Sequence, residues 1–173
     1  MNMSMSSWVF VETYNSVKHE WEYAHPYVKD RYAEGCFKRV DLDYGSNHIL
    51  FSILDADSRY NSNYTMEEIN YELPDDVSKE LKEEEEIIAD AETEKTRGVT
   101  YRWFPLSELY IETIEHPTIK AEDIDYPIDE EERINPLCAL YRDVYTIAKL
   151  YCDNYTWNEN IRTNTRVIIC TSY

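Results

Sequence analysis

The spacing of apolar residues predicts β-strands at both ends of the chain. Residues 8–14 are rich in β-branched and aromatic side chains, a composition typical of strands. Residues 165–171 are almost continuously apolar, which indicates a central strand that is covered on both faces. Further strands are predicted near residues 37–42 and at residues 99–104. We therefore expect a sheet that contains both terminal segments.

Several other segments carry apolar residues at helical spacing. Residues 47–56 have apolar side chains three and four positions apart, with Ser46 or Asn47 as the expected N-cap. A short helix is also expected to begin within residues 105–110. The helix within residues 47–56 is expected to be mostly buried.

The clearest helix begins at Asn135 and Pro136. Asparagine is a good N-cap, and proline is tolerated at the first helical position because its missing N–H would have no partner there. One face of the helix is apolar and consists of Leu137, Leu140, Tyr141, Val144, Ile147, Ala148 and Tyr151.

A long acidic helix is predicted to begin within residues 73–76, Leu-Pro-Asp-Asp, and to end near Glu94. Proline suits the first turn, and the aspartates suit the positive end of the helix dipole. The run of four glutamates at residues 83–86 is expected to face mostly water. The apolar stripe is narrow and consists of Val77, Leu81, Ile88 and Ala91.

Together these elements predict one α+β domain over residues 1–173. A chain of 173 residues is long enough to bury a substantial core without metals or disulfides. We expect a small, mainly antiparallel sheet with terminal strands and about three to four helices. Residues 115–135 contain two prolines and many carboxylates, and they are expected to form an acidic surface connection.

The charge is concentrated in the middle of the chain. The net charge is −18, and residues 67–132 contain 23 acidic and 6 basic side chains. We do not expect the protein to coat nucleic acid directly, because that mode of binding needs clustered Lys and Arg to displace counterions. Only three glycines are present, which disfavours a glycine-lined phosphate loop.

The four cysteines are Cys36, Cys138, Cys152 and Cys170, and their spacing matches no metal motif. The first residues have no basic segment followed by an apolar core, and no later stretch is apolar enough to cross a membrane. We expect a cytosolic protein with free thiols, most of them buried.

Metal-binding signals are weak. Residues 55–57, Asp-Ala-Asp, open like a calcium loop, but Arg59, Tyr60 and Met66 occupy positions that need a ligand, a glycine and a glutamate. Asp55 and Asp57 have two possible roles. They could bind Mg²⁺ or Mn²⁺, or they could end a helix and pair with Arg59. We predict no metal and no cofactor.

Catalytic signals are also weak. The sequence has no Gly-x-Ser-x-Gly elbow, and its four histidines form no compact pair. No catalytic residue is assigned, and a non-enzymatic protein is favoured over an enzyme.

Aromatic residues are the most suggestive feature, with 16 Tyr and 4 Trp. Basic and aromatic side chains are adjacent at Arg59 and Tyr60, and at Arg102 and Trp103. Such pairs can hold a phosphate beside a stacked base, although Tyr and Trp also serve as ordinary core and rim residues.

Three segments carry a family resemblance. They are Tyr44-Gly-Ser-Asn-His-Ile-Leu-Phe-Ser-Ile-Leu-Asp-Ala-Asp-Ser-Arg59, Leu73-Pro-Asp-Asp-Val-Ser78 and Tyr101-Arg-Trp-Phe-Pro-Leu-Ser-Glu-Leu109. In order and spacing they resemble a family of uncharacterised bacteriophage accessory proteins. The resemblance implies a phage protein that acts in the cytoplasm of the bacterial host. A ligand pocket beside a helix end is expected to use Asp55, Asp57, Arg59, Tyr60, Arg102 and Trp103.

Three functions are compatible with these features. The first is a counter-defence protein that binds and sequesters a small nucleotide-like immune signal without turnover. Such a protein could form a homo-oligomer. Such a protein needs a local positive pocket inside a negative molecule. The second is an acidic mimic of nucleic acid that inhibits a basic host or defence protein, and the third is an enzyme that degrades the nucleotide.

Overall fold

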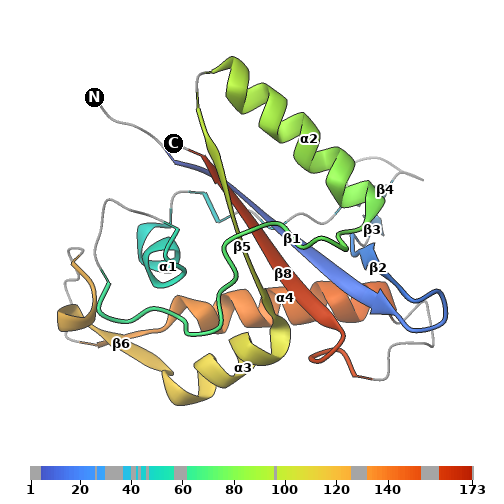
Figure 1. The fold of residues 1–173 in the computed structure, drawn as a ribbon. Coiled ribbons are helices and arrows are strands. Elements are labelled where there is room, and N and C mark those ends of the chain that lie inside the picture. The colour runs from blue at the N-terminus through green and yellow to red at the C-terminus, as the bar shows by residue number, and fades with distance from the viewer. Residues whose placement is uncertain are drawn as a thin grey trace.

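We describe a computed structural model of the chain (Figure 1). The structure describes residues 5–25, 27–29, 37–39, 42, 44–45, 47–56, 62–95, 97–125, 132–152 and 160–172. Its elements in chain order are β1 (Ser6–Asn15), β2 (Glu20–Tyr23), β3 (Tyr27–Lys29), β4 (Phe37–Arg39), α1 (His48–Ile53), α2 (Lys79–Glu94), β5 (Val99–Pro105), α3 (Leu106–Glu115), β6 (Thr118–Lys120), the 3-10 helix η1 (Ala121–Asp123), β7 (Glu132–Ile134), α4 (Pro136–Cys152) and β8 (Thr165–Ser172).

A four-stranded antiparallel sheet organises the fold, in the order β2-β1-β8-β5. The two terminal strands are neighbours, with Phe10 opposite Ile168. Strand β8 is central, and every one of its residues is buried. The predicted α+β domain, with terminal strands in a small antiparallel sheet and four α-helices in the described residues, is confirmed.

The larger part of the core lies on the sheet face that α1, α3 and α4 cover (Figure 1). Val11, Val167 and Ile169 point to this face and pack with apolar side chains of the three helices. Leu140 and Val144, from the predicted apolar face of α4, are fully buried there. Successive residues of a strand point to opposite faces of the sheet, so the neighbours of Val11, Val167 and Ile169 along β1 and β8 point to the other face.

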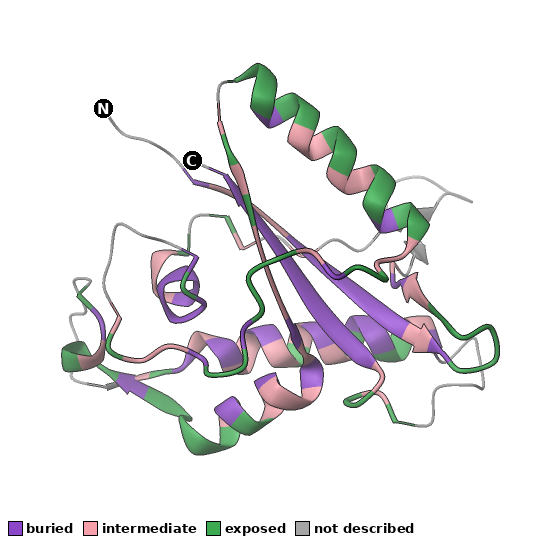
Figure 2. Cartoon of the chain, in the orientation of Figure 1, coloured by how far each residue is buried: buried purple, intermediate pink, exposed green. Residues whose placement is uncertain are grey.

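Helix α2 covers the other face of the sheet with a smaller apolar cluster (Figure 2). Leu81 is fully buried against Phe10, Ile168 and Cys170. Most of the remaining α2 surface is exposed or only partly covered. We call this side of the sheet the α2 face.

The caps of α1 and α4 are those that the sequence predicts. Asn47 Oδ1 accepts a hydrogen bond from the Leu50 N–H at 3.0 Å, and Asn135 Oδ1 accepts one from the Leu137 N–H at 3.0 Å. Each side chain gives a partner to an amide that the helix itself leaves free. Helix α3 begins directly after Pro105, within the predicted range.

The predicted start of α2 is wrong, although its end at Glu94 is correct. The helix begins at Lys79, and Ser78 is its N-cap, accepting from the Leu81 N–H at 3.3 Å. The preceding segment is a turn in which the Val77 N–H donates to the Pro74 carbonyl. Asp76 does not cap the helix, because Arg166 binds its carboxylate.

The segment at residues 115–135 contains more regular structure than a surface connection implies. Strands β6 and β7 pair within it, with Thr118 opposite Ile134. Ile119 and Ile124 are buried, which attaches the segment to the core. Residues 126–131 lie outside the described residues.

Strands β3 and β4 pair with each other in a separate two-stranded sheet, and β4 lies within residues 37–42, where the sequence predicts a strand.

Among the described residues, no helix is both long and apolar enough to cross a membrane.

Candidate functional site

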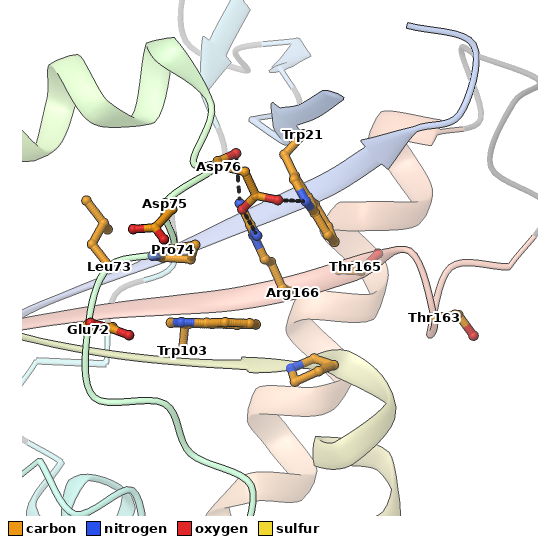
Figure 3. A pocket seen from close by; sticks show the side chains of 11 residues that line it. Trp21, Glu72, Leu73, Pro74, Asp75, Asp76, Trp103, Thr163, Thr165 and Arg166 are labelled. Carbon is orange, nitrogen blue, oxygen red and sulfur yellow. Dashed lines mark hydrogen bonds and ion pairs between the residues drawn. The ribbon is translucent and has the colours of Figure 1, made fainter. Parts of the chain in front are cut away.

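An open cavity of about 620 Å³ lies on the α2 face, where β8 begins and β5 ends (Figure 3). Its walls come from edge strand β2, from the turn before α2, from β5 and from the start of β8. The lining residues are Trp21, Glu72, Leu73, Pro74, Asp75, Asp76, Trp103, Pro105, Thr163, Thr165 and Arg166.

Arg166 lies at the base of this cavity and is only 3% exposed. Its Nε and Nη2 donate to Oε1 of Glu12 at 2.9 and 2.7 Å. Its Nη1 donates to Oδ1 of Asp76 at 2.7 Å, and Nη2 also reaches the Asp76 carbonyl at 3.3 Å. The guanidinium is therefore held by two carboxylates from different parts of the chain.

Glu12 is fully buried, and both of its carboxylate oxygens have donors. Oε1 accepts from Arg166, and Oε2 accepts from the Ser78 N–H at 2.7 Å. A buried ion pair is tolerated only when its remaining hydrogen-bonding capacity is also satisfied. Here the second oxygen of Glu12 connects the sheet to the residue that caps α2.

Two tryptophans flank the Arg166 guanidinium (Figure 3). Its Cζ atom lies 4.0 Å from the ring centroid of Trp21 and 5.6 Å from that of Trp103. Trp21 is on β2 and Trp103 is on β5, the two edge strands of the sheet. Both rings are partly exposed, so the cavity has aromatic walls that a flat ligand can contact.

Asp76 links the cavity wall to both Trp21 and Arg166. Its Oδ2 accepts from the indole Nε1 of Trp21 at 3.1 Å, while Oδ1 accepts from Arg166. Partial burial alone would raise the pKa of Asp76, but the hydrogen bond and positive charge of Arg166 outweigh burial and lower that pKa. Asp76 is thus held in its charged form.

Carboxylates outnumber cations at the cavity. Glu72 and Asp75 are exposed at its rim, and the side chain of Asp76 is 69% exposed. Arg166 is the one Lys or Arg among the described lining residues, and its charge already faces Glu12 and Asp76. The expected positive pocket is therefore not what this cavity provides.

The structure brings together two of the residues predicted to form a site, Asp55 and Arg102. Nη2 and Nε of Arg102 donate to the Asp55 carbonyl at 2.7 and 3.2 Å. The Tyr71 hydroxyl donates to Oδ2 of Asp55 at 3.1 Å, and Arg102 Cζ lies 4.7 Å from the Tyr71 ring centroid. Burial raises the pKa of Tyr71 most, and the hydrogen bond to Asp55 raises it further.

Trp103 is separated from this cluster. Arg102 and Trp103 are successive residues of β5, so their side chains point to opposite faces of the sheet. Trp103 enters the cavity on the α2 face, whereas Arg102 binds the end of α1 on the other side. Asp57, Arg59 and Tyr60 lie outside the described residues.

Sequence reasoning missed Glu12 and Arg166. Both were visible as single charges inside otherwise apolar or aromatic strands. A charge in such a position needs a partner, and the two have opposite signs. Antiparallel pairing of the terminal strands places the two residues opposite each other, so the isolated charges are the sequence signal for this ion pair.

The described residues offer little for metal or thiolate chemistry. They contain no group of three or more His, Cys, Asp or Glu side chains placed to hold a metal ion. Cys170 is buried, and burial raises its thiol pKa to about 12. Burial also raises the pKa of the Cys138 thiol.

The cavity can stack a flat ring on indole and can accept hydrogen bonds through its carboxylates. Comparisons with protein-family models, curated proteins and solved structures find no match to this chain.

Proposed function

We propose that the protein binds a small ligand with a nucleobase-like ring in the cavity at Arg166, and does so without chemical turnover. The observation that supports this most is the pair of partly exposed indoles, Trp21 and Trp103, beside an immobilised guanidinium. Stacking of a base on an aromatic side chain contributes about 1–3 kcal/mol.

The dimensions and rigidity of the cavity support the same function. Its volume of about 620 Å³ falls within the usual range for small-molecule sites. Arg166 fixes the walls, because it contacts Trp21, Trp103 and Asp76 from the central strand. A site whose walls are already held in place loses less side-chain freedom on binding.

The biological role that we propose is sequestration of a base-containing immune signal in the cytoplasm of a bacterial host. It rests on the resemblance of residues 44–109 to bacteriophage accessory proteins, together with the cavity. Binding without release or turnover would keep the signal from its receptor. A homo-oligomer is compatible with this role.

Isothermal titration against nucleosides, nucleotides, cyclic oligonucleotides and ADP-ribose derivatives tests the proposal. We expect one of these ligands to bind the wild type, and we expect Trp103→Ala or Trp21→Ala to weaken that binding at least about fivefold. Arg102→Ala is the matched control, because Arg102 neighbours Trp103 in sequence but lies on the opposite face. Absence of heat with every ligand would reject the proposal.

The same samples distinguish binding from catalysis. After prolonged incubation, mass spectrometry should recover the ligand unchanged. A product that accumulates with the wild type would instead support the nucleotide-degrading enzyme.

An acidic inhibitor is the second candidate, and helix α2 supports it. The helix presents exposed carboxylates, among them Glu83 and Glu86, to solvent (Figure 2). Such a surface favours a basic partner, with binding that weakens as salt rises. If Glu83→Gln with Glu86→Gln leaves binding to a DNA-binding host or defence protein and its salt dependence unchanged, this candidate fails.

A further inference from the structure

We infer that the cavity selects a base-like ring that is uncharged or cationic and bears amino groups, and that it disfavours a phosphate at its mouth. The inference rests on the proposed function and specifies its ligand class. It follows from how the charges of Arg166 and its neighbours are arranged.

Arg166 is a poor anchor for a phosphate. Its Nε and Nη2 bind Oε1 of Glu12, and its Nη1 binds Oδ1 of Asp76, with distances of 2.7 to 2.9 Å. A phosphate that took these donors would leave Glu12 buried without its counter-charge. Leaving a buried charge unpaired is strongly unfavourable, so the ion pair is expected to persist when a ligand binds.

The rim adds negative charge that nothing in the cavity lining offsets. Glu72 and Asp75 are exposed, and both lie on the segment from Glu72 to Asp76 that precedes α2. A like-charge pair about 4 Å apart in water weakens binding about fivefold. Each phosphate placed near this rim should therefore reduce affinity measurably at low salt.

The same groups favour amino-bearing rings. Carboxylates accept hydrogen bonds and cannot donate them when charged, so they suit the exocyclic amino groups of adenine, guanine or cytosine. The indole faces of Trp21 and Trp103 attract positive charge as well as flat rings. A ring that is protonated or amino-substituted gains from both.

Four nucleosides and their 5′-monophosphates provide matched pairs that differ only in the phosphate. By isothermal titration at 20 mM salt, we expect adenosine, guanosine or cytidine to have an affinity at least about fivefold higher than that of its monophosphate. The difference should shrink at 300 mM salt, because exposed charges are then screened. Uridine should bind more weakly than cytidine.

Two double variants identify the source of the difference. Glu72→Gln with Asp75→Asn removes two charges at the rim and should bring nucleoside and nucleotide to similar affinities. Glu83→Gln with Glu86→Gln also removes two charges, but from α2 and outside the cavity lining, and it should leave the affinity difference between nucleoside and nucleotide intact. Thermal melting of each variant confirms that it is folded.

The outcomes separate this inference from the proposed function. If a nucleoside binds but its monophosphate binds equally well or more tightly, the inference is wrong and the proposed binding function stands. If none of the eight compounds binds, the inference fails, and the wider ligand series then decides the proposed function.

Discussion

Glu12 and Arg166 lie directly opposite each other on β1 and β8 and form an ion pair inside the sheet, with Nη2 and Oε1 2.7 Å apart. Glu12 is fully buried and Arg166 is 3% exposed. The pair lies between the terminal segments of the chain, and its second carboxylate oxygen binds the Ser78 N–H at the start of α2. It therefore joins three distant segments.

Glu12→Ala should destabilise the protein by about 3 to 5 kcal/mol, because it removes the buried counter-charge of Arg166. Urea denaturation followed by tryptophan fluorescence measures this change. Asp76 alone would then face the guanidinium, and its side chain is largely exposed. A loss below about 1 kcal/mol would mean that solvent or Asp76 replaces Glu12.

The double replacement Glu12→Leu with Arg166→Met is the control for that variant. Removing both charges together leaves no unpaired ion, so it should recover most of the lost stability. The exposed carboxylate of Asp76 can be solvated in this variant. A double variant as unstable as Glu12→Ala would show that packing or the lost acceptor for the Ser78 N–H, and not the unpaired charge, causes the loss.

Ser78→Ala should destabilise the protein by about 1 kcal/mol, because Ser78 Oγ caps the Leu81 N–H at the start of α2. Asp75→Ala is the comparison, since Asp75 is exposed and precedes the helix. Its effect should stay within about 0.5 kcal/mol. A larger loss for Asp75→Ala than for Ser78→Ala would place the helix start where the sequence pattern put it.

The error at the start of α2 has a physical cause. Leu73, Pro74 and Asp75 form a good local signal for a first helical turn. Local propensity could not include Arg166, which lies 90 residues from Asp76 and binds its carboxylate. Tertiary contact therefore decides the boundary here. By contrast, α4 and β8 were predictable, because each carries a long apolar pattern that packing reinforces.

The candidate site was predicted less well than the fold, for a similar reason. Trp103 is one of the predicted site residues and does line the cavity, but its neighbour Arg102 points away because strand residues alternate. The residues that complete the cavity are Trp21 and Arg166, which come from β2 and β8. Their meeting depends on the strand order β2-β1-β8-β5, which no local pattern encodes.

Leu81→Ala should destabilise the protein by about 2 to 5 kcal/mol. Leu81 is the fully buried apolar residue of α2, and it packs on Phe10 and Ile168 of the sheet. Ile87 on the same helix is 70% exposed, so Ile87→Ala should change stability by less than about 0.5 kcal/mol. Denaturation monitored by circular dichroism compares the two, and equal effects would contradict the observed docking of α2.

The far end of α2 is held by Glu92, and this contact predicts an acid-dependent loss of stability. Glu92 is 2% exposed, and its Oε2 accepts from the Ser172 hydroxyl at 2.8 Å, while its Oε1 lies 3.2 Å from Lys95 Nζ. The hydrogen bond from Ser172 lowers the pKa of Glu92; burial opposes this effect, and Lys95 and Arg97 reinforce it.

A carboxyl with a lowered pKa in the folded state stabilises the protein fully above its unfolded pKa, near 4.5, and loses that contribution as the pH falls through its folded pKa. The wild type should therefore lose stability below about pH 4.5 in part through Glu92. Glu92→Gln should be less stable at neutral pH and show a shallower decline in acid. Ser172→Ala removes the strongest donor and raises the folded pKa of Glu92 towards 4.5, so the decline should be smaller and should end at a higher pH. Urea midpoints between pH 2.5 and 7 measure both changes, and parallel curves for all three proteins would contradict the role of Glu92.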